Sequence, residues 1–291
     1  MADILNAFTV DVEDYYHVSA FERVVDRASW GERESRVERN TERLLELLAA
    51  REVSGTFFVL GWVARRFPAL VRRIAEAGHE LASHSFWHRL VYELSPEEFR
   101  RDLRDSRSAI EDASGHAVTS YRAPSFSITQ ASLWALDILA EEGFDCDSSV
   151  FPIHHDRYGI PNADRFLHRR QTAAGPLWEF PATTARWGSV NLPIAGGGYF
   201  RLYPWTVTAR MLRSFAATTG EPFVFYTHPW EIDAAQPRIS GIDLRSRFRH
   251  YVNLARTESK LERLLRSFRF GRLRDVIQQR QAATTEPIGS T

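Results

Sequence analysis

Three acidic side chains follow a hydrophobic segment near the amino terminus. The sequence FTVDVEDYYHV, residues 8–18, contains an apolar, β-branched run that is typical of a buried strand. Asp11, Glu13 and Asp14 lie at its end, with His17 close behind. Burying an unpaired carboxylate is unfavourable, so such groups normally pair, bind a metal ion or stay in water. Because strand side chains alternate, Asp11 and Glu13 can share a face, and Asp14 can turn inward once the strand has ended.

Two histidines, His84 and His88, stand four residues apart in the sequence HSFWH. On a helical turn, residues with this spacing share a face, so both imidazoles can reach one cation. Two histidines and one carboxylate are a common ligand set for Zn²⁺ or a similar divalent metal, with positions left for water and substrate. An isolated pair of histidines with this spacing more often consists of polar residues near a turn that bind no metal. The acids at the end of the first strand nevertheless favour a metal site here. Spacing alone leaves Glu13 and Asp14 as alternative carboxylate ligands.

Other segments that we predict to be strands also end in reactive residues. TSYR ends at Arg122, FDCD at Asp147 and FVFYTH at His228, while ELASH ends at His84. In parallel α/β folds, the active site lies at the carboxyl ends of the strands and in the loops after them. We therefore expect these strand ends to converge on one cleft.

The elements that must position these residues alternate between two periods. Strand-like segments such as NAFTVDV and GTFFVLG are separated by segments with helical spacing, such as VERNTERLLELLAARE and FPALVRRIAEAG. Ser95, Pro96 and Glu98 form a capping-box sequence with proline in the first turn, and Gly115 follows the helix that they begin. Repeated strand–helix–strand units predict parallel strands, and about six or seven of them favour a barrel-like α/β fold over a flat sheet.

The second half of the chain is less regular. It contains many turn-forming residues between 152 and 203, and we predict strands at LWEFPAT and at GYFRLY, residues 198–203. A helix in PWTVTARMLRSFAATTG, a strand in PFVFYTHPWE and an amphipathic helix in TESKLERLLRSF follow. The basic, aromatic run RSRFRHYVNLAR can approach an anionic glycan or lipid phosphate, although the simpler interpretation is a solvated helix face. Residues 278–291 are polar and without periodicity, so we expect a disordered tail.

The composition limits the class of protein. The chain has 291 residues, 44% of them hydrophobic, which suits one large domain or two small ones. Lys plus Arg and Asp plus Glu each number 37, and this balance gives no electrostatic footprint for nucleic acid. The single cysteine, Cys146, excludes an internal disulfide framework. We see no signal-peptide pattern and no apolar stretch near the roughly 20 residues of a membrane span, so we expect a cytoplasmic protein that is not transmembrane.

Taken together, the motifs resemble those of the polysaccharide deacetylase family, also called the NodB homology domain or carbohydrate esterase family 4. TVDVED, HSFWH, YRAPSF, DCDSSVF and FYTHP occur in the family's order between about residues 8 and 232. More narrowly, VDVEDYYHV, DSSVFPIHHDRYG, GGGYFRLYP and THPWEID resemble the branch found with exosortase and exopolysaccharide gene clusters. The C-terminal extension of that branch would begin near residue 233, within one domain over residues 1–277. The resemblance implies a distorted (β/α)₇ barrel, which agrees with the strand count.

The resemblance also implies a reaction, namely hydrolysis of the N-acetyl group of amino sugars with a divalent metal, Zn²⁺ or alternatively Co²⁺, Ni²⁺ or Mn²⁺. Asp11 matches the general base, and His84 and His88 match the metal histidines. Glu13 or Asp14 matches the metal carboxylate, and the D-V-E-D spacing is closer to the branch that favours Glu13.

Four further positions match the family. Arg122 matches the arginine that holds the base, and His228 matches the general acid. Asp147 matches the acid that orients this histidine, and the backbone N–H of Ser125 falls near the oxyanion donor. Ser125 replaces the usual tyrosine, and the fourth motif lacks its tryptophan, whose place Phe151 can fill. These departures affect the expected substrate more than the expected chemistry.

The expected substrate is an acetylated amino-sugar polymer of an exopolysaccharide or its lipid-linked oligosaccharide precursor. The exopolysaccharide assembly machinery is then a candidate partner. Two alternatives stay open, a hydrolase of a small cyclic amide that resembles allantoinase and a sugar-binding protein that has lost catalysis.

Overall fold

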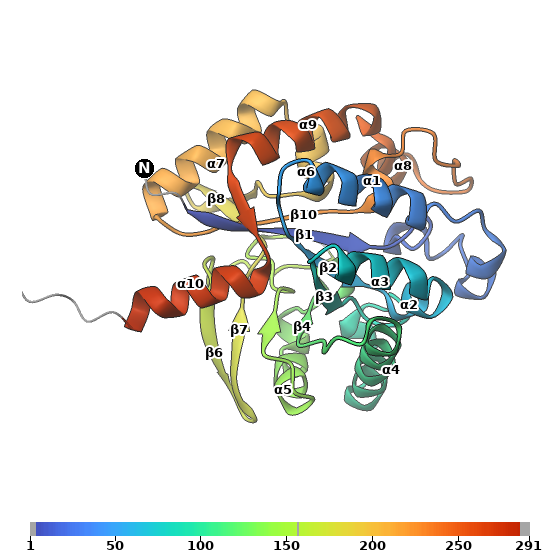
Figure 1. The fold of residues 1–291 in the computed structure, drawn as a ribbon, viewed down its shortest axis with the longest axis horizontal. Helices are drawn as coiled ribbons and strands as arrows, with labels where there is room; N and C mark the ends of the chain where they lie inside the picture. The colour runs from blue at the N-terminus through green and yellow to red at the C-terminus, as the bar shows by residue number, and fades with distance from the viewer. Residues whose placement is uncertain (1–3, 156, 286–291) are drawn as a thin grey trace, which may run out of the picture.

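A curved, mostly parallel β-sheet forms the centre of the computed structural model, which describes residues 4–155 and 157–285 (Figure 1). The strands of this sheet are β1 (Leu5–Val12), β2 (Thr56–Val59), β3 (Glu80–Ser83), β4 (Ser120–Tyr121), β5 (Cys146–Asp147), β6 (His168–Thr172), β7 (Gly175–Glu179), β10 (Val224–Thr227) and β11 (Arg269–Gly271). Their order is β10-β1-β2-β3-β4-β5-β7-β6, and β11 also pairs with β1. All neighbours from β10 to β7 run parallel, whereas β6 is antiparallel to β7. The predicted parallel strands are therefore present.

Helices surround the sheet and connect most of its parallel strands (Figure 1). They are α1 (Val37–Ala49), α2 (Gly61–Arg66), α3 (Pro68–Glu76), α4 (Pro96–Ser114), α5 (Trp134–Glu141), α6 (Gly197–Leu202), α7 (Trp205–Thr219), α8 (Leu244–Tyr251), α9 (Leu254–Ser267) and α10 (Leu273–Thr285). A separate hairpin consists of β8 (Thr184–Trp187) and β9 (Val190–Pro193). Within the described residues, no helix combines the length and the apolar character needed to cross a lipid bilayer.

Local sequence signals account for the best-defined of these elements. The hydroxyl of Ser95 accepts a hydrogen bond from the Glu98 backbone, and the Glu98 carboxylate accepts one from the Ser95 backbone, so α4 begins with the predicted capping box. Gly115 ends α4 in the left-handed conformation at φ +73°, which favours glycine. The helices pack their apolar faces on buried strand residues such as Phe8 and Phe57, both fully buried.

Two predictions for the second half of the chain were wrong. Residues 198–203 were expected to form a strand, but α6 occupies most of them. The buried residues of α6 are Gly197, Phe200 and Arg201, which are spaced by three and four residues as on one helix face. A six-residue segment such as GYFRLY is too short to reveal this period. The expected disordered tail is helical from residue 278 to Thr285, within α10, while residues 286–291 lie outside the described residues.

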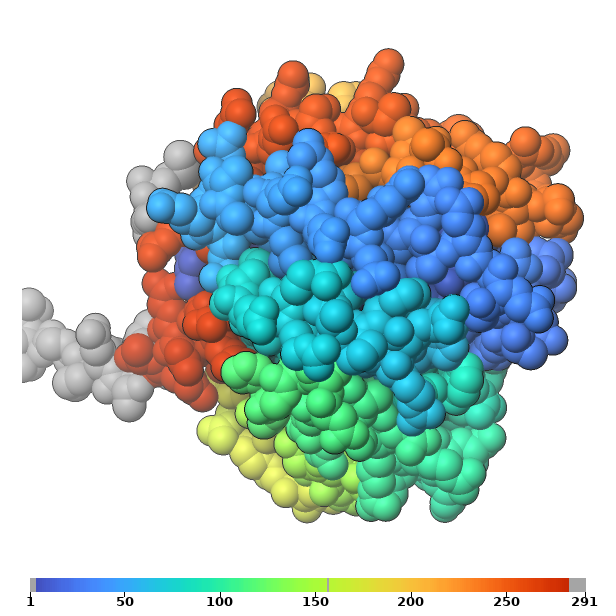
Figure 2. All heavy atoms as spheres, turned by 45° about the vertical axis from the view of Figure 1, so that its right-hand side comes forward, coloured from blue at the N-terminus to red at the C-terminus, as the bar shows by residue number. Residues whose placement is uncertain are grey.

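The C-terminal segment belongs to the same body as the rest of the chain. Strand β11 runs parallel to the beginning of β1, with Leu5 paired to Arg269 and Ala7 to Gly271. The segment after β1 packs in one buried apolar cluster with Trp230 and Leu254. Figure 2 shows the blue amino-terminal segment and the orange C-terminal segment side by side at the surface. The segment after residue 233 therefore contributes to the region around the end of β1.

Candidate active site

Residues from four strands meet at the carboxyl end of the sheet. Asp11 lies in β1 and Glu13 just after it, while His84, Arg122 and His228 directly follow β3, β4 and β10. Because these strands are parallel and close together in the sheet, their carboxyl ends face the same side. The first four residues are at most 2% exposed, and the side chain of His228 is 17% exposed. The expected convergence of the strand ends is thus present.

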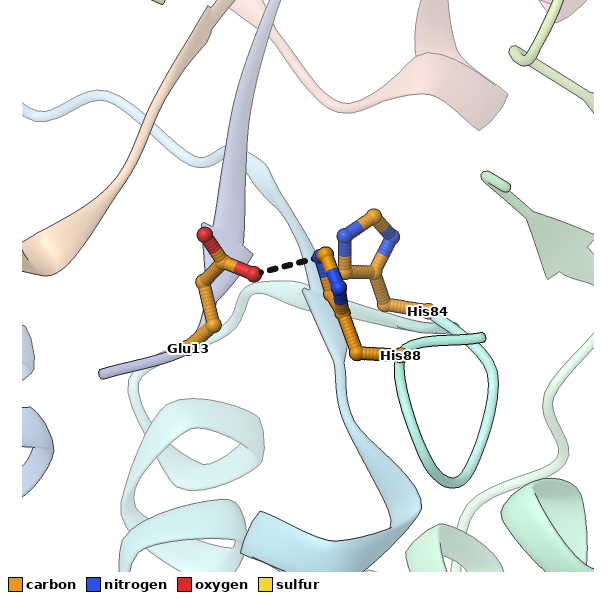
Figure 3. Close-up of side chains that lie close together, drawn as sticks. All are labelled: Glu13, His84 and His88. Carbon is orange, nitrogen blue, oxygen red and sulfur yellow. Dashed lines mark ion pairs between the residues drawn. The ribbon is translucent and has the colours of Figure 1, made fainter. Parts of the chain in front are cut away.

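Glu13, His84 and His88 form a buried cluster whose composition suits a metal ion (Figure 3). One ligand atom from each residue lies within 4.8 Å of the other two. The carboxylate Oε2 of Glu13 is 2.8 Å from Nε2 of His88, and Figure 3 shows the carboxylate directed toward the two imidazoles. One carboxylate and two imidazoles are the donor set that the sequence predicted.

The protonation of these groups also fits a cation. Nδ1 of His84 lies 2.8 Å from the carbonyl oxygen of Arg122. Since a carbonyl only accepts, Nδ1 carries the proton, which leaves the Nε2 lone pair free for a ligand bond. Burial lowers the pKa of His84 to about 4, so the ring is neutral near pH 7. Burial by itself raises the pKa of Glu13, but the imidazoles of His88, His228 and His84 outweigh it and lower that pKa, so Glu13 is ionised.

The loop between the two histidines is not the helical turn that the spacing suggested. Ser85 and His88 have positive φ values of 69° and 53°, so left-handed residues bring the imidazoles together. Asp102 of α4 holds this loop, because its carboxylate accepts hydrogen bonds from the Ser85 hydroxyl at 2.5 Å and from the Phe86 backbone at 2.8 Å. Asp102 is thus a supporting residue that sequence analysis did not identify.

Asp14 lies outside this cluster. Its Oδ2 accepts hydrogen bonds from the Ser35 hydroxyl at 2.7 Å and from the backbone N–H groups of Arg36 at 2.7 Å and Val37 at 3.1 Å. These donors stand at the amino-terminal end of α1, where a carboxylate is stabilised by the free N–H groups and the helix dipole. Of the two carboxylates that the sequence left open, the geometry therefore favours Glu13 as the ligand and gives Asp14 a role in anchoring α1.

Asp11 and Arg122 form a fully buried ion pair beside the cluster. Nη1 of Arg122 donates to Oδ1 of Asp11 at 2.7 Å and also to the Thr9 hydroxyl at 2.7 Å. The remaining guanidinium nitrogens donate to the carbonyl and hydroxyl oxygens of Ser148, and the guanidinium lies 4.2 Å from the Phe58 ring centroid. Arg122 is held on several sides, so it fixes one oxygen of Asp11 and leaves Oδ2 directed elsewhere. The expected contact between Arg122 and Asp11 is therefore present, and the role of Asp11 as the base stays a prediction.

His228 stands opposite, with Glu231 as its partner. Nε2 of His228 is 3.8 Å from both Asp11 Oδ2 and Glu13 Oε1, so it faces the same small volume. Nδ1 is 2.7 Å from Oε1 of Glu231. Burial alone lowers the pKa of His228, but the hydrogen bond and charge of Glu231, together with Glu13 and Asp11, raise it to about 9. At neutral pH His228 is a proton donor.

The predicted contact between Asp147 and His228 is wrong. Asp147 accepts hydrogen bonds from the Ser149 hydroxyl at 2.5 Å and the Ser149 backbone at 3.0 Å, on β5. Burial and the charge of Asp147 raise the pKa of neighbouring Glu179 well above its ordinary value, so Glu179 keeps its proton. Asp147 therefore organises the strand end near Arg122, and Glu231 occupies the position that was assigned to it. The only sequence signal for Glu231 is its place three residues after His228.

Trp230 and Ser125 complete the surroundings. The indole Nε1 of Trp230 donates to Glu13 Oε1 at 3.2 Å, and its ring stacks on that of His228 with centroids 5.1 Å apart. Ser125 adopts the left-handed conformation at φ +53° in a short 3₁₀ helix, and its hydroxyl lies 2.6 Å from that of Ser19. The assignment of its backbone N–H as an oxyanion donor stays a prediction.

The family models divide the chain in two. Residues 28–143 match the family described as polysaccharide deacetylase, and residues 148–278 match a domain of unknown function, DUF3473. Residues 28–143 are therefore similar to polysaccharide deacetylases. The first match includes the histidine pair and Arg122, whereas His228 and Glu231 lie in the second. The second match begins well before the extension that was expected near residue 233.

Curated relatives agree with this family. A peptidoglycan-N-acetylglucosamine deacetylase of Bacillus cereus is 31% identical over 98 residues, 33% of this chain and 36% of that protein. A chitooligosaccharide deacetylase of Rhizobium leguminosarum bv. trifolii is 29% identical over 140 residues, 47% of this chain and 61% of that protein. The matched stretches thus span about one third and three fifths of these two relatives.

Solved structures share the fold over nearly the whole chain. A Mycobacterium smegmatis protein assigned as a polysaccharide deacetylase superposes with a TM-score of 0.64 at 20% identity, covering 99% of this chain and 94% of that one. Puue allantoinase also reaches a TM-score of 0.64, at 14% identity, covering 98% and 93%. At such identities the likeness concerns the fold alone, and it confirms the predicted barrel of the polysaccharide deacetylase type.

Proposed function

We propose that this protein is a metal-dependent deacetylase that removes N-acetyl groups from amino sugars of an exopolysaccharide or its lipid-linked precursor. The observation that supports the proposal most strongly is that a candidate proton acceptor, Asp11, and a candidate proton donor, His228, lie beside one candidate metal site. Asp11 and His228 both face the volume next to Glu13, with Oδ2 of Asp11 3.8 Å from Nε2 of His228. Amide hydrolysis needs a base that can reach the attacking water and an acid that can reach the leaving nitrogen of the same amide group.

The residues of the site divide the work of the reaction. A cation held by Glu13, His84 and His88 would supply Lewis acidity toward the acyl oxygen and a lowered pKa for water. The free Oδ2 of Asp11 accepts the proton of the attacking water, because Arg122 binds Oδ1 and holds the carboxylate in place. After the attack, Nε2 of His228 donates its proton to the amine nitrogen, which allows that nitrogen to leave as a neutral amine.

Two neighbouring contacts support these roles. Glu231 accepts from Nδ1 of His228 and stabilises the protonated ring, so the donor faces the site with Nε2. Trp230 donates to Oε1 of Glu13, which leaves Oε2 of the same carboxylate on the side of the histidine pair. Such outer contacts orient metal ligands and fix their protonation.

The printed names of the relatives support the choice of substrate class. The Bacillus cereus and Rhizobium leguminosarum proteins are named for peptidoglycan N-acetylglucosamine and chitooligosaccharide deacetylation. An acetylated glucosamine polymer is the class that these names share. That the polymer is an exopolysaccharide, that assembly proteins are partners and that the protein is cytoplasmic are parts of the same proposal.

Acetate release by purified protein tests the proposal against its alternatives. The protein is loaded in turn with Zn²⁺, Co²⁺, Ni²⁺ and Mn²⁺ and offered acetylated amino-sugar oligomers or small cyclic amides such as allantoin. Acetate release from the oligomers, with no opening of the cyclic amides, supports the deacetylase. Opening of the cyclic amides alone would make the protein an allantoinase-like hydrolase, and oligomer binding without acetate release under every metal would make it a sugar-binding protein.

A further inference from the structure

A cavity of about 350 Å³ lies beside the candidate active site, and arginines from three separate segments line it. Arg201 belongs to α6, Arg245 and Arg249 to α8, and Arg157 to the loop after β5. Residues that precede β10 in the chain and residues that follow it therefore line the same cavity. It is distinct from the cluster of Glu13, His84 and His88.

The charges around this cavity are unbalanced. Within the described residues, the side chains of Arg157, Arg245 and Arg249 form no ion pair or hydrogen bond that would neutralise them. Asp243 is the one acid among the described lining residues, and its carboxylate accepts from the backbone N–H of Ser246 at the start of α8. Net positive charge thus remains at the wall, and it attracts an anion.

Arg201 forms the fixed, buried part of the wall. It is only 3% exposed, and its Nη groups donate to the carbonyl oxygens of Arg249, His250 and Val252. These contacts hold the backbone at the end of α8, the helix that carries Arg245 and Arg249. Nε of Arg201 has no hydrogen bond and lies 3.6 Å from Oε2 of Glu231.

A single aromatic ring, that of Trp230, lies between the cavity and His228, the candidate general acid. Trp230 lines the cavity, stacks on His228 with centroids 5.1 Å apart, and stacks on His250 at 4.2 Å on α8. A sugar unit held with its acetamide at His228 can therefore reach the cavity with a neighbouring substituent. A second cavity of about 440 Å³ shares Arg245 and Arg249, which gives room for a group larger than a single ion.

We propose that this arginine-lined cavity binds an anionic group, a carboxylate or a phosphate, carried by the saccharide next to the acetamido sugar. This inference rests on the proposed deacetylase function and narrows its substrate class to saccharides that carry an anionic group. The planar guanidinium of arginine matches both anions with paired hydrogen bonds. The arginine-rich run that the sequence presented as a solvated helix face is then partly a binding surface.

Three acetylated trisaccharides that differ only in charge test this inference. One is neutral, one carries a uronate next to the acetamido sugar, and one carries a phosphate at the reducing end. Binding to the metal-loaded Asp11→Asn variant is measured by calorimetry, so that no turnover is needed. We expect at least one anionic trisaccharide to bind about 10-fold or more tightly than the neutral one, because charge-assisted hydrogen bonds are gained. Which anion is preferred distinguishes a uronate substrate from a phosphate-linked one.

Matched double variants locate the effect. R245Q/R249Q removes two charges that line the cavity, and we expect it to abolish most of the anionic preference. R247Q/R256Q removes two exposed arginine charges that do not line the cavity and should keep the preference. Equal binding of all three trisaccharides, or the same preference in R245Q/R249Q as in the parent, overturns this inference alone. Absence of acetate release by the wild-type protein from every trisaccharide overturns the proposed function instead.

Discussion

Nδ1 of His228 lies 2.7 Å from Oε1 of Glu231, a partner only three residues further along the chain. His228 directly precedes a short 3₁₀ helix over Pro229–Ile232, which contains Glu231 and directly follows β10. Glu231 is fully buried, so its charge acts on the imidazole with little screening by water. The imidazole and the carboxylate that raises its pKa are therefore positioned by the same turn of backbone.

Replacing Glu231 by glutamine should shift the alkaline limb of the pH–activity profile to lower pH. His228 must carry its proton to act, so activity is present below its pKa and is lost as the pH rises through it. The hydrogen bond and charge of Glu231 help to raise this pKa to about 9, and the charge of a bound cation places the limb below that value. We expect E231Q to lower the limb by about one pH unit or more and to reduce kcat by about 10- to 100-fold. The measurement is kcat and kcat/KM for acetate release by both proteins between pH 6 and 10, with pH as the only variable.

Asp147→Asn is the control for that experiment. Asp147 contacts Ser149 and not His228, so D147N should leave the position of the alkaline limb unchanged, even if it lowers stability. A limb that moves in D147N and stays in E231Q would restore Asp147 as the partner of the histidine and refute the assignment of Glu231.

The two carboxylates after β1 should respond differently to neutralisation. We expect Glu13→Gln to lose most bound metal, because it removes the anionic ligand of the cluster. Asp14→Asn should retain metal and lower the free energy of unfolding by about 1–2 kcal/mol, because it weakens the contacts at the start of α1. Metal analysis together with denaturant unfolding separates the two effects, and metal loss in D14N with full occupancy in E13Q would exchange the roles.

Asp11→Asn should keep bound metal and lose turnover. The substitution retains the shape of the side chain and a hydrogen-bonding oxygen for Arg122, but it removes the basicity of Oδ2. Loss of a positioned proton acceptor typically costs about 10² to 10⁴ in rate. Metal content and acetate release are measured on the same preparation, with His84→Ala as the variant expected to lose metal. Near-native turnover by D11N would exclude Asp11 as the base.

His79 should make the fold sensitive to mild acid. His79 is only 9% exposed, and its Nδ1 accepts a hydrogen bond from the Gly55 backbone at 3.0 Å. Burial and the nearby Arg272 lower its pKa to about 4, below the value of roughly 6.5 in an unfolded chain. Between these values the unfolded state binds more protons, so stability falls as the pH falls from about 6.5 to 4, by up to about 1.4 kcal/mol per pH unit.

Denaturant unfolding across that pH range checks the sign. His79→Gln should reduce the slope of unfolding free energy against pH, and the exposed His116→Gln should leave it unchanged. The other buried histidines contribute equally to both variants and cancel in the comparison. An unchanged slope in H79Q would show that His79 does not titrate on unfolding.

The parts of the site that the sequence predicted are those tied to strand ends. Asp11, His84, Arg122 and His228 each follow or end a recognisable strand, so the parallel sheet alone brings them together. The capping box of α4 was equally visible, because its signal is contained within four consecutive residues. Local patterns of this kind survive folding because neighbouring elements agree with them.

The parts that escaped prediction depend on packing between distant segments. Asp14 accepts hydrogen bonds from the backbone at the start of α1, more than 20 residues further along the chain, and no spacing rule predicts that contact. Asp102 supports the histidine loop from the middle of α4, and its side chain would otherwise be an ordinary helix-surface acid. The choice of Glu231 over Asp147 was likewise settled by which acid the backbone places beside His228. Tertiary contacts of this kind require the structure.

The central claim is that a cation bound by Glu13, His84 and His88 is required for deacetylation. The most direct test is acetate release from an acetylated glucosamine oligomer by one protein sample that is metal-loaded, then treated with chelator, then reloaded. Our account predicts release by the loaded protein, its loss on chelation and its recovery on reloading, with no recovery in H84A. Acetate release that persists at the same rate in the chelated, metal-free protein would contradict it.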